Sequence, residues 1–171
     1  MSSDRIVTQE PIETKIARIL TNTEMTVTTA ESCTGGLVAG TLVNASGISK
    51  GFKEGYIVYS DEAKQKLLGV KEETLKRYGA VSRQTAEEMA KGAANAANAD
   101  AAIVTTGVAG PEGGTKEKPV GLVYIGCYVK GHIVVKRCFY SGSRQSIRYA
   151  AVKEALEILY CQLLTQKKYS R

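Results

Sequence analysis

Apolar and polar residues alternate along the first half of the chain in patterns that predict helices and short strands. Residues 11–21 carry isoleucine and leucine at helical spacing, which is typical of an amphipathic helix. Residues 25–29 are short and rich in Val and Thr, which favours a buried strand. The apolar residues 37–43 predict a helix. A second strand is expected over residues 52–60, and a short helix over residues 61–68.

The second half of the chain predicts further helices, a central strand and a hairpin. Residues 71–78 favour a short helix, and Ser82 is suited to cap a longer one. Residues 101–106 form a continuous apolar run, which is typical of a central buried strand. Lys130 and Gly131 form a turn signal between two strands. The hairpin strands are expected over 121–129 and 132–140, and a final amphipathic helix over 145–164.

This order of elements predicts one α/β domain. We expect three layers, α/β/α, around a mixed sheet of about five strands that is parallel in part and includes an antiparallel hairpin. The 171 residues fit a single domain, and no internal repeat is evident. Residues 1–10 are expected to be an N-terminal extension, 11–164 the folded domain and 165–171 a basic tail.

Composition and charge narrow the classes of function. The net charge of +6 suits nucleic acid or an anionic small substrate. Scattered basic residues and few aromatic ones disfavour nucleic acid. No apolar run approaches the ~20 residues that span a bilayer, and the first residues lack a signal-peptide pattern, so we expect a cytoplasmic protein without membrane contact. The cysteines show no metal-binding spacing, and neither a metal nor another cofactor is implied.

The segment from Ala30 to Gly36 joins an expected strand to an expected helix and carries Ser32. Backbone N–H groups are free at such a helix start, and the helix dipole favours negative charge there. The two glycines let a ligand approach the backbone closely. These N–H groups could hold a phosphate, or the oxyanion that forms when Ser32 attacks a carbonyl. The alternative is an ordinary capped helix with a polar turn.

A nucleophilic serine needs a base. The single histidine, His132, falls at the hairpin turn and is expected to be exposed, which disfavours a Ser-His-Asp triad. Lys64 follows the second strand, and shielding from water would lower its pKa so that it could accept the Ser32 proton. Tyr59 could orient Lys64 or relay a proton. The alternatives are that Lys64 is a surface lysine and that Tyr59 only packs against its neighbours. Cys33 is a rival nucleophile, since the helix start would lower the pKa of its thiol.

Polar residues follow three of the expected strands, around Ser32, Ser60 and Thr106. In open α/β sheets, ligands bind outside the carboxyl ends of the strands. These three loops converge on one crevice if their strands are parallel neighbours.

These motifs, taken in order, resemble the C-terminal domain family of the competence/damage-inducible protein CinA, which includes stand-alone nicotinamide-nucleotide amidases. The matching segments are 30–36, 59–64, 67–70, 79–82, 106–111, 113–115 and 118–121. The ordered match covers roughly residues 11–164.

The resemblance implies hydrolysis of nicotinamide mononucleotide to nicotinic acid mononucleotide and ammonia through an acyl-enzyme, in pyridine nucleotide recycling. It implies that Ser32 is the nucleophile and Lys64 the general base, with Tyr59 assisting. Arg144 could pair with the substrate phosphate, and its alternative role is solvation of a helix start. The implied oxyanion and substrate-binding residues are Cys33, Thr34, Gly35, Gly36, Thr106, Gly107, Gly113, Gly114, Thr115 and Arg144.

The chain departs from the commoner family pattern at Asp61, where many relatives carry Asn. A negative charge there would raise the pKa of Lys64 and weaken it as a base. Two other hypotheses stay open: a non-catalytic nucleotide- or partner-binding module, and a thiol enzyme or redox sensor that uses Cys33. A homo-oligomer, with a dimer favoured, is expected because apolar helices on small α/β domains often pair.

Overall fold

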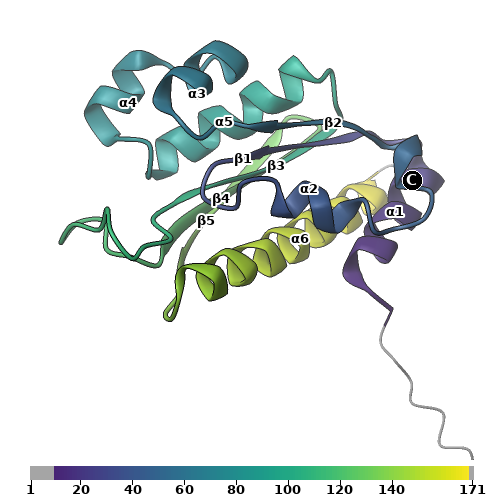
Figure 1. Cartoon of the computed structure of the whole chain (residues 1–171). Coiled ribbons are helices and arrows are strands. Elements are labelled where there is room, and N and C mark those ends of the chain that lie inside the picture. Colours follow the sequence, from purple (N-terminus) through teal and green to yellow (C-terminus); the bar gives the residue numbers. More distant parts are fainter. Residues whose placement is uncertain (1–9, 170–171) are drawn as a thin grey trace, which may run out of the picture.

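Five strands form one mixed sheet in the computed structural model, which describes residues 10–169 (Figure 1). The strands are β1 (Val27–Glu31), β2 (Phe52–Ile57), β3 (Ala101–Gly107), β4 (Leu122–Val129) and β5 (His132–Phe139). Their order across the sheet is β2-β1-β3-β4-β5. Strand β1 is parallel to both of its neighbours, whereas β4 is antiparallel to β3 and β5. The predicted mixed sheet is therefore confirmed.

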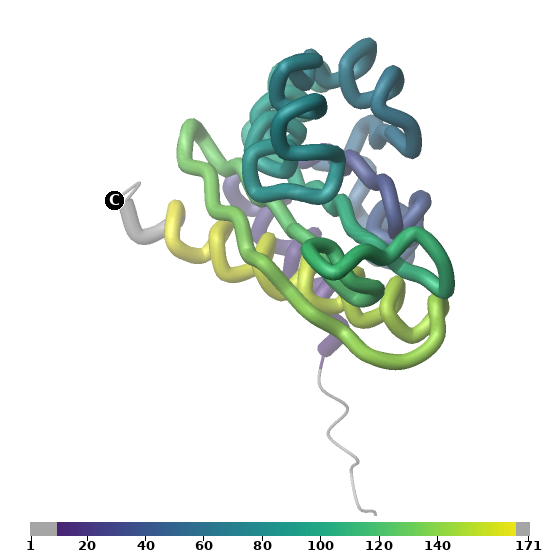
Figure 2. Tube along the Cα trace, turned by 90° about the vertical axis from the view of Figure 1, so that its left-hand side faces the viewer, coloured from purple at the N-terminus to yellow at the C-terminus, as the bar shows by residue number. Residues whose placement is uncertain are grey.

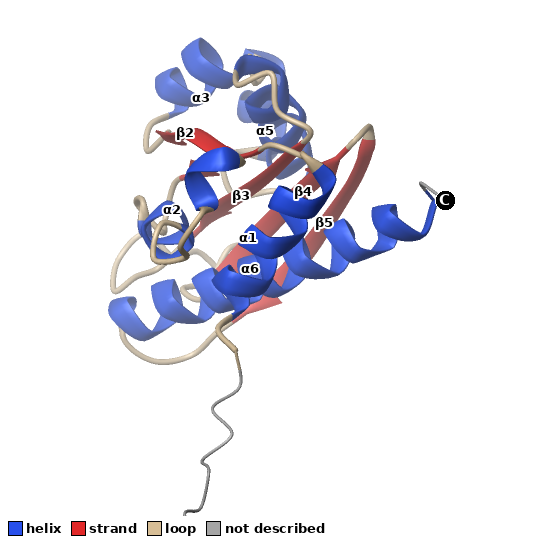
Figure 3. Cartoon of the chain, turned by 90° about the vertical axis from the view of Figure 1, so that its right-hand side faces the viewer, coloured by secondary structure: helices blue, strands red, loops and turns tan. Residues whose placement is uncertain are grey.

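Helices cover both faces of this sheet (Figure 3). They are α1 (Ile12–Thr23), α2 (Leu37–Leu42), α3 (Asp61–Leu68), α4 (Glu72–Tyr78), α5 (Arg83–Ala96) and α6 (Arg144–Tyr169), with a short 3-10 turn η1 (Ile48–Lys50). Helices α1, α2 and α6 pack on one face, and α3, α4 and α5 lie on the other. Alternate residues of β3 serve the two faces, because side chains of a strand point to opposite sides: Ile103 joins the first core and Val104 the second. None of the helices within residues 10–169 is long and apolar enough to cross a membrane.

The carboxyl ends of β1, β2 and β3 meet at one edge of the sheet. Glu31, the last residue of β1, pairs with Ile57 of β2 and with Thr105 of β3. The segments that follow these strands therefore start side by side. The loop of residues 108–121, between β3 and β4, lies beside the start of α6 (Figure 2), where Arg144 Nη1 donates to the Gly110 carbonyl oxygen. This edge is where the sequence predicts a ligand site.

Three predicted boundaries are wrong. Strand β1 runs to Glu31 instead of ending at residue 29, and the edge strand β2 ends at Ile57 instead of residue 60. Helix α6 runs to Tyr169, so most of the expected basic tail is helical, which suits its good helix formers Gln and Lys. Residues 170–171 and 1–9, which hold the rest of that tail and nearly all of the expected extension, lie outside the described residues. The expected dimer stays a prediction.

Helix α3 can lie against α5 because α5 carries a glycine at the contact. A Cβ atom added at Gly92 would collide with the carbonyl oxygen of Leu68 at the end of α3. Helix α3 also carries Lys64. The separation of these two helices therefore sets where the Lys64 side chain enters the sheet edge.

Gly92→Ala is expected to destabilise the protein by about 1–3 kcal/mol, because the new methyl group forces α3 away from α5. Gly40→Ala is the matched control, since Gly40 also lies in a helix but a Cβ there meets nothing within 4 Å. The control should be neutral or more stable by up to about 1 kcal/mol, from helix propensity alone. Urea unfolding followed by circular dichroism measures both. Equal stability of the two variants would contradict this account of the contact.

Candidate active site

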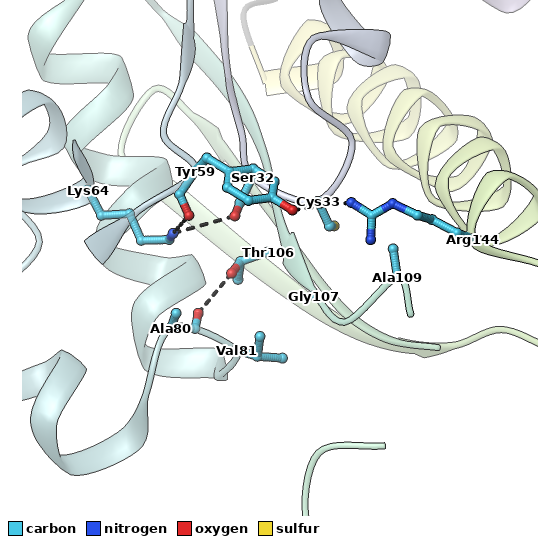
Figure 4. A pocket seen from close by; sticks show the side chains of 10 residues that line it. All are labelled: Ser32, Cys33, Tyr59, Lys64, Ala80, Val81, Thr106, Gly107, Ala109 and Arg144. Atoms are coloured by element: carbon cyan, nitrogen blue, oxygen red, sulfur yellow. Dashed lines mark hydrogen bonds between the residues drawn. The ribbon is translucent and has the colours of Figure 1, made fainter. Parts of the chain in front are cut away.

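A cavity of about 210 Å³ opens at the carboxyl edge of the parallel strands (Figure 4). It is lined by Ser32, Cys33, Tyr59, Lys64, Ala80, Val81, Thr106, Gly107, Ala109 and Arg144. These residues come from the segments after β1 and β2, from α3, from the end of β3 and the loop after it, from the α4–α5 connection and from the start of α6. The three polar loops singled out in the sequence therefore do converge on one pocket.

The Lys64 amine lies next to the Ser32 hydroxyl. Lys64 Nζ is 3.4 Å from Ser32 Oγ, and both side chains are buried, with Lys64 only 1% exposed. Three carbonyl oxygens in a row also accept hydrogen bonds from this nitrogen, those of Val58, Tyr59 and Ser60, at 3.0, 3.3 and 3.4 Å. Because β2 ends at Ile57, these three residues are free to curl around the amine.

Burial lowers the pKa of Lys64. Desolvation of the ammonium is the largest influence, while the negative charge of Asp61 raises the pKa. The charge on Glu62 acts in the same direction as that on Asp61. The expectation that Asp61 opposes a basic lysine is thus correct in direction, but burial outweighs it. The net result is an amine that loses its proton more readily than an exposed lysine.

The Tyr59 phenol does not contact Lys64. Tyr59 is 63% exposed, and its Oη accepts a hydrogen bond of 3.2 Å from Arg144 Nη2 at the rim of the pocket. Only the backbone carbonyl of Tyr59 reaches the Lys64 amine. The idea that the phenol orients the lysine is therefore wrong for this geometry, because the two groups meet different partners.

The start of α2 already holds an anion, and that anion is Glu31. Glu31 Oε2 accepts from the N–H groups of Gly36 and Val38, both at 3.0 Å, and Oε1 accepts from the Ala39 N–H at 2.8 Å. The Thr34 hydroxyl donates to the same carboxylate at 2.6 Å. Since these groups are occupied, the expectation that Gly36 and the helix start bind a substrate anion is wrong.

Most of the other backbone N–H groups in this turn are also engaged. The Ser32 N–H donates to the Thr105 carbonyl, and the Gly35 N–H donates to the Ser32 carbonyl. Thr34 is fully buried, and its hydroxyl also contacts Thr105 Oγ1 at 2.7 Å. Gly35 and Thr34 therefore shape the turn and do not line the pocket. The N–H groups of Cys33 and Thr34 are different, because neither donates to an oxygen atom of residues 10–169, and of these two residues only Cys33 lines the pocket.

Arg148, which follows a small-residue loop together with Arg144 as in the family that the sequence resembles, is a residue to which sequence reasoning gave no role in this site. Its Nε donates to the Cys33 carbonyl at 3.1 Å, and its Nη2 to the Thr34 carbonyl at 2.8 Å. Arg148 lies in α6, more than a hundred residues from the turn that it holds. Its position four residues after Arg144, one helical turn along the same face, is the one signal in the sequence that could have indicated it.

Cys33 is poorly suited to act as a nucleophile. Burial raises the pKa of its thiol to about 11, so the thiol keeps its proton near neutral pH. The backbone N–H of Cys33 lowers the pKa of the thiol, but burial outweighs it, and the negative charge of Glu31, which holds the helix start, also raises that pKa.

The remaining predicted residues divide into two groups. Thr106 and Gly107 line the pocket, and the Thr106 hydroxyl donates to the Ala80 carbonyl at 2.8 Å. Gly113, Gly114 and Thr115 are exposed and do not line it. Thr115 instead closes a turn with Lys118 through its N–H and its hydroxyl, which directs this part of the loop outward. Within residues 10–169, no group of three or more His, Cys, Asp or Glu could hold a metal ion.

Fold and pocket together define a three-layer α/β domain with a buried serine–lysine pair at the edge of a mixed sheet. Residues 9–163 match the model of the CinA C-terminal domain, and the chain therefore belongs to that family. A competence-damage inducible relative from Clostridium beijerinckii is 53% identical over 86% of this chain, and a CinA-like protein from Kosmotoga olearia is 52% identical over 92%. The chain spans 36% and 38% of these two relatives.

Solved structures agree with this assignment. A CinA superfamily protein from Klebsiella pneumoniae 700603 matches with a TM-score of 0.86 and 36% identity, covering 90% of this chain and 96% of that one. The competence/damage inducible protein CihA from Agrobacterium tumefaciens matches with a TM-score of 0.83 and 43% identity, covering 91% and 98%. The predicted fold and family are thus both confirmed.

Glu31→Ala is expected to destabilise the protein by at least about 2 kcal/mol, because it leaves buried N–H groups at the start of α2 without an acceptor. Glu31→Gln keeps one oxygen and should lose less. Glu87→Ala, at an exposed position of α5, is the control and should unfold at nearly the wild-type urea concentration. If Glu31→Ala unfolds together with that control, the carboxylate is not what holds the turn.

Proposed function

We propose that this domain is an amidohydrolase that converts nicotinamide mononucleotide to nicotinic acid mononucleotide and ammonia. Ser32 is the nucleophile and Lys64 the general base. The observation that carries the proposal is a buried amine, 3.4 Å from a serine hydroxyl, at the base of a pocket. Membership of the CinA C-terminal domain family, which includes nicotinamide-nucleotide amidases, supports the choice of substrate.

A neutral Lys64 amine can turn its lone pair to Ser32 while the carbonyl groups around it accept its N–H groups. A neutral amine has two N–H groups and one lone pair, whereas an ammonium has three N–H groups and no lone pair. When two of the three carbonyl oxygens of residues 58–60 accept the two N–H groups, the lone pair is left for the Ser32 hydroxyl. The lowered pKa of Lys64 favours this form. The amine is thereby prepared to take the serine proton.

In the first half of the reaction, Ser32 Oγ bonds to the amide carbon while its proton moves to Lys64 Nζ, and the carbonyl oxygen becomes an oxyanion. The C–N bond then breaks. The Lys64 ammonium returns its proton to the departing nitrogen, ammonia leaves, and an ester remains on Ser32. In the second half, water bonds to the ester carbon and gives a proton to Lys64. The ester C–O bond breaks, and Ser32 recovers its proton as the acid product leaves.

Two groups are suited to stabilise the oxyanion. The Cys33 N–H is in the position expected of an oxyanion donor, directly after the nucleophile, and Cys33 lines the pocket. The Cys33 N–H contacts the thiol of the same residue. Sulfur is a weak acceptor, so a substrate oxygen can displace it. The second group is the Tyr59 hydroxyl, which accepts from Arg144 and so keeps its own proton for donation. In this proposal Tyr59 assists the oxyanion and not the base.

The pocket and its rim fit a pyridine mononucleotide. About 210 Å³ is smaller than the roughly 300–1,000 Å³ of pockets for drug-sized ligands, so the cavity suits the flat pyridine carboxamide. The ribose and phosphate would then lie at the open rim. There the exposed Arg144 guanidinium uses two N–H groups on Gly110 and Tyr59, which leaves others for a phosphate.

Ammonia release from nicotinamide mononucleotide tests the proposal, measured for the wild type beside Ser32→Ala and Lys64→Met. Each variant should lose at least about a hundred-fold in kcat, because each removes one partner of the proton transfer. Lys66→Met is the matched control, since Lys66 is exposed on the same helix, and it should keep the wild-type rate.

Three results would contradict the proposal. A Ser32→Ala variant with the full rate would exclude the serine. Loss of activity in Cys33→Ala together with retention in Ser32→Ala would select the thiol. Binding of the nucleotide by the wild type without any ammonia release would instead identify a binding module.

A further inference from the structure

We infer that Arg148 is a positioning residue that orients and polarises the oxyanion donor of this site through two peptide groups. The inference rests on the proposed function, because it assumes that the Cys33 N–H faces the developing oxyanion. It adds a role for a residue that touches neither the substrate nor the Ser32 and Lys64 side chains.

The path from Arg148 to the pocket is a chain of hydrogen bonds. Arg148 Nη2 donates to the Thr34 carbonyl oxygen at 2.8 Å, and that carbonyl shares its peptide group with the Gly35 N–H. The Gly35 N–H donates to the Ser32 carbonyl oxygen at 3.2 Å, and that carbonyl shares its peptide group with the Cys33 N–H. The Cys33 N–H lies at the end of this path, beside the pocket.

Because peptide groups are planar, this chain of hydrogen bonds fixes the direction in which the Cys33 N–H points. Both peptide groups are trans, so the N–H of each points opposite to its C=O. Holding the Thr34 carbonyl fixes where the Gly35 N–H points, and holding the Ser32 carbonyl fixes where the Cys33 N–H points. Arg148 Nε also holds the Cys33 carbonyl at 3.1 Å, so all three consecutive peptide groups of the turn are anchored.

The positive charge of Arg148 acts along the same chain of hydrogen bonds. No salt bridge to Arg148 occurs within residues 10–169, so its guanidinium acts on the carbonyl dipoles. A cation at the Thr34 oxygen draws electron density toward it and makes the Gly35 N–H a stronger donor. The Ser32 carbonyl is polarised in turn, which strengthens the Cys33 N–H as a donor, since hydrogen bonds in a chain reinforce one another.

The turn leaves space for this guanidinium. Gly35 has a φ of +60°, and a Cβ there would lie 3.3 Å from Arg148 Nη2. A side chain at this position would therefore be strained and would also press on the arginine. The glycine that appeared in the sequence as a ligand contact is thus better explained as room for Arg148.

The test measures two reactions of Ser32 in the wild type, Arg148→Met and Arg148→Lys. One is ammonia release from nicotinamide mononucleotide, with kcat and KM determined separately. The other is phosphonylation by a small alkyl fluorophosphonate, in which an Oγ–P bond forms, the P–F bond breaks and Lys64 takes the proton. The second reaction uses the same oxyanion donor without depending on the natural substrate. Lys153→Met, at an exposed lysine of α6, is the control for loss of a charge.

For Arg148→Met we expect kcat and the phosphonylation rate to fall together by about ten- to a hundred-fold, less than removal of an oxyanion donor outright. KM and the pH midpoint of the reaction should stay at wild-type values, because neither binding nor Lys64 is altered. Arg148→Lys should be intermediate, since it keeps the charge but lacks the two-pronged contact. In a further variant, Arg148→Ala, added guanidinium at sub-denaturing concentration should recover part of the rate, which a merely structural role would not produce.

A folded Arg148→Met variant with wild-type rates would overturn the inference. So would a raised KM with unchanged kcat, which would make Arg148 a binding residue, or a rate loss that only follows the unfolded fraction. If the wild type releases no ammonia but Ser32 is phosphonylated, the proposed function fails while the phosphonylation rates still decide the role of Arg148. If wild-type Ser32 is not phosphonylated, the inference fails as well.

Discussion

The rest of the site depends on removing the Lys64 amine from water. Transfer of a charged ammonium into a protein interior is costly, and a buried lysine therefore tends to lose its proton. The fold compensates with three successive backbone carbonyls after β2, and it brings the amine to Ser32 at the end of the neighbouring parallel strand. Two structural features make this possible. The edge strand β2 ends early, and α3 approaches α5 closely at Gly92.

A second buried charged side chain, that of Glu31, holds the serine turn in place. The Glu31 carboxylate sits under the turn and takes up the N–H groups at the start of α2, while Arg148 holds two carbonyls of the same turn from α6. The two charged side chains thus anchor donors and acceptors of one short segment. Among residues 32–36, the N–H groups of Ser32, Gly35 and Gly36 are engaged in shaping the turn. Those of Cys33 and Thr34 are not, and Cys33 is the one of the two that lines the pocket.

Local sequence signals were sufficient for the fold. Runs of Val, Ile and Thr, helical spacing of apolar residues and glycine or serine at helix ends predict the order of elements, and that order implies the mixed sheet. The same signals place Ser32 and Lys64 after parallel strands, so their proximity could be predicted once the strands were taken as neighbours. The exposed hairpin position of His132 was also predictable from its turn.

The parts that sequence reasoning missed depend on where chains cross in space. Nothing local indicates that Glu31 is the last strand residue and folds back under its own turn, or that Arg148 reaches that turn from the last helix. The three glycine-rich segments look alike as sequence. The segment at Gly35 shapes the turn around Arg148, and the segment that begins at Gly107 lines the pocket. The segment from Gly113 to Thr115 points outward because Thr115 hydrogen-bonds to Lys118. The residues that each segment contacts, rather than its glycine content, decide these roles.

The most direct test of this account is the pKa of the Lys64 amine, followed by NMR of isotopically labelled lysine side chains with Lys64→Met to assign the signal. Lys64 should titrate at lower pH than the exposed lysines of the same protein, because burial lowers its pKa. Asp61→Asn should move the titration lower still, because the Asp61 charge raises that pKa. A Lys64 signal that titrates together with the exposed lysines, or above them, would contradict the account, since the amine would then hold its own proton and could not accept that of Ser32.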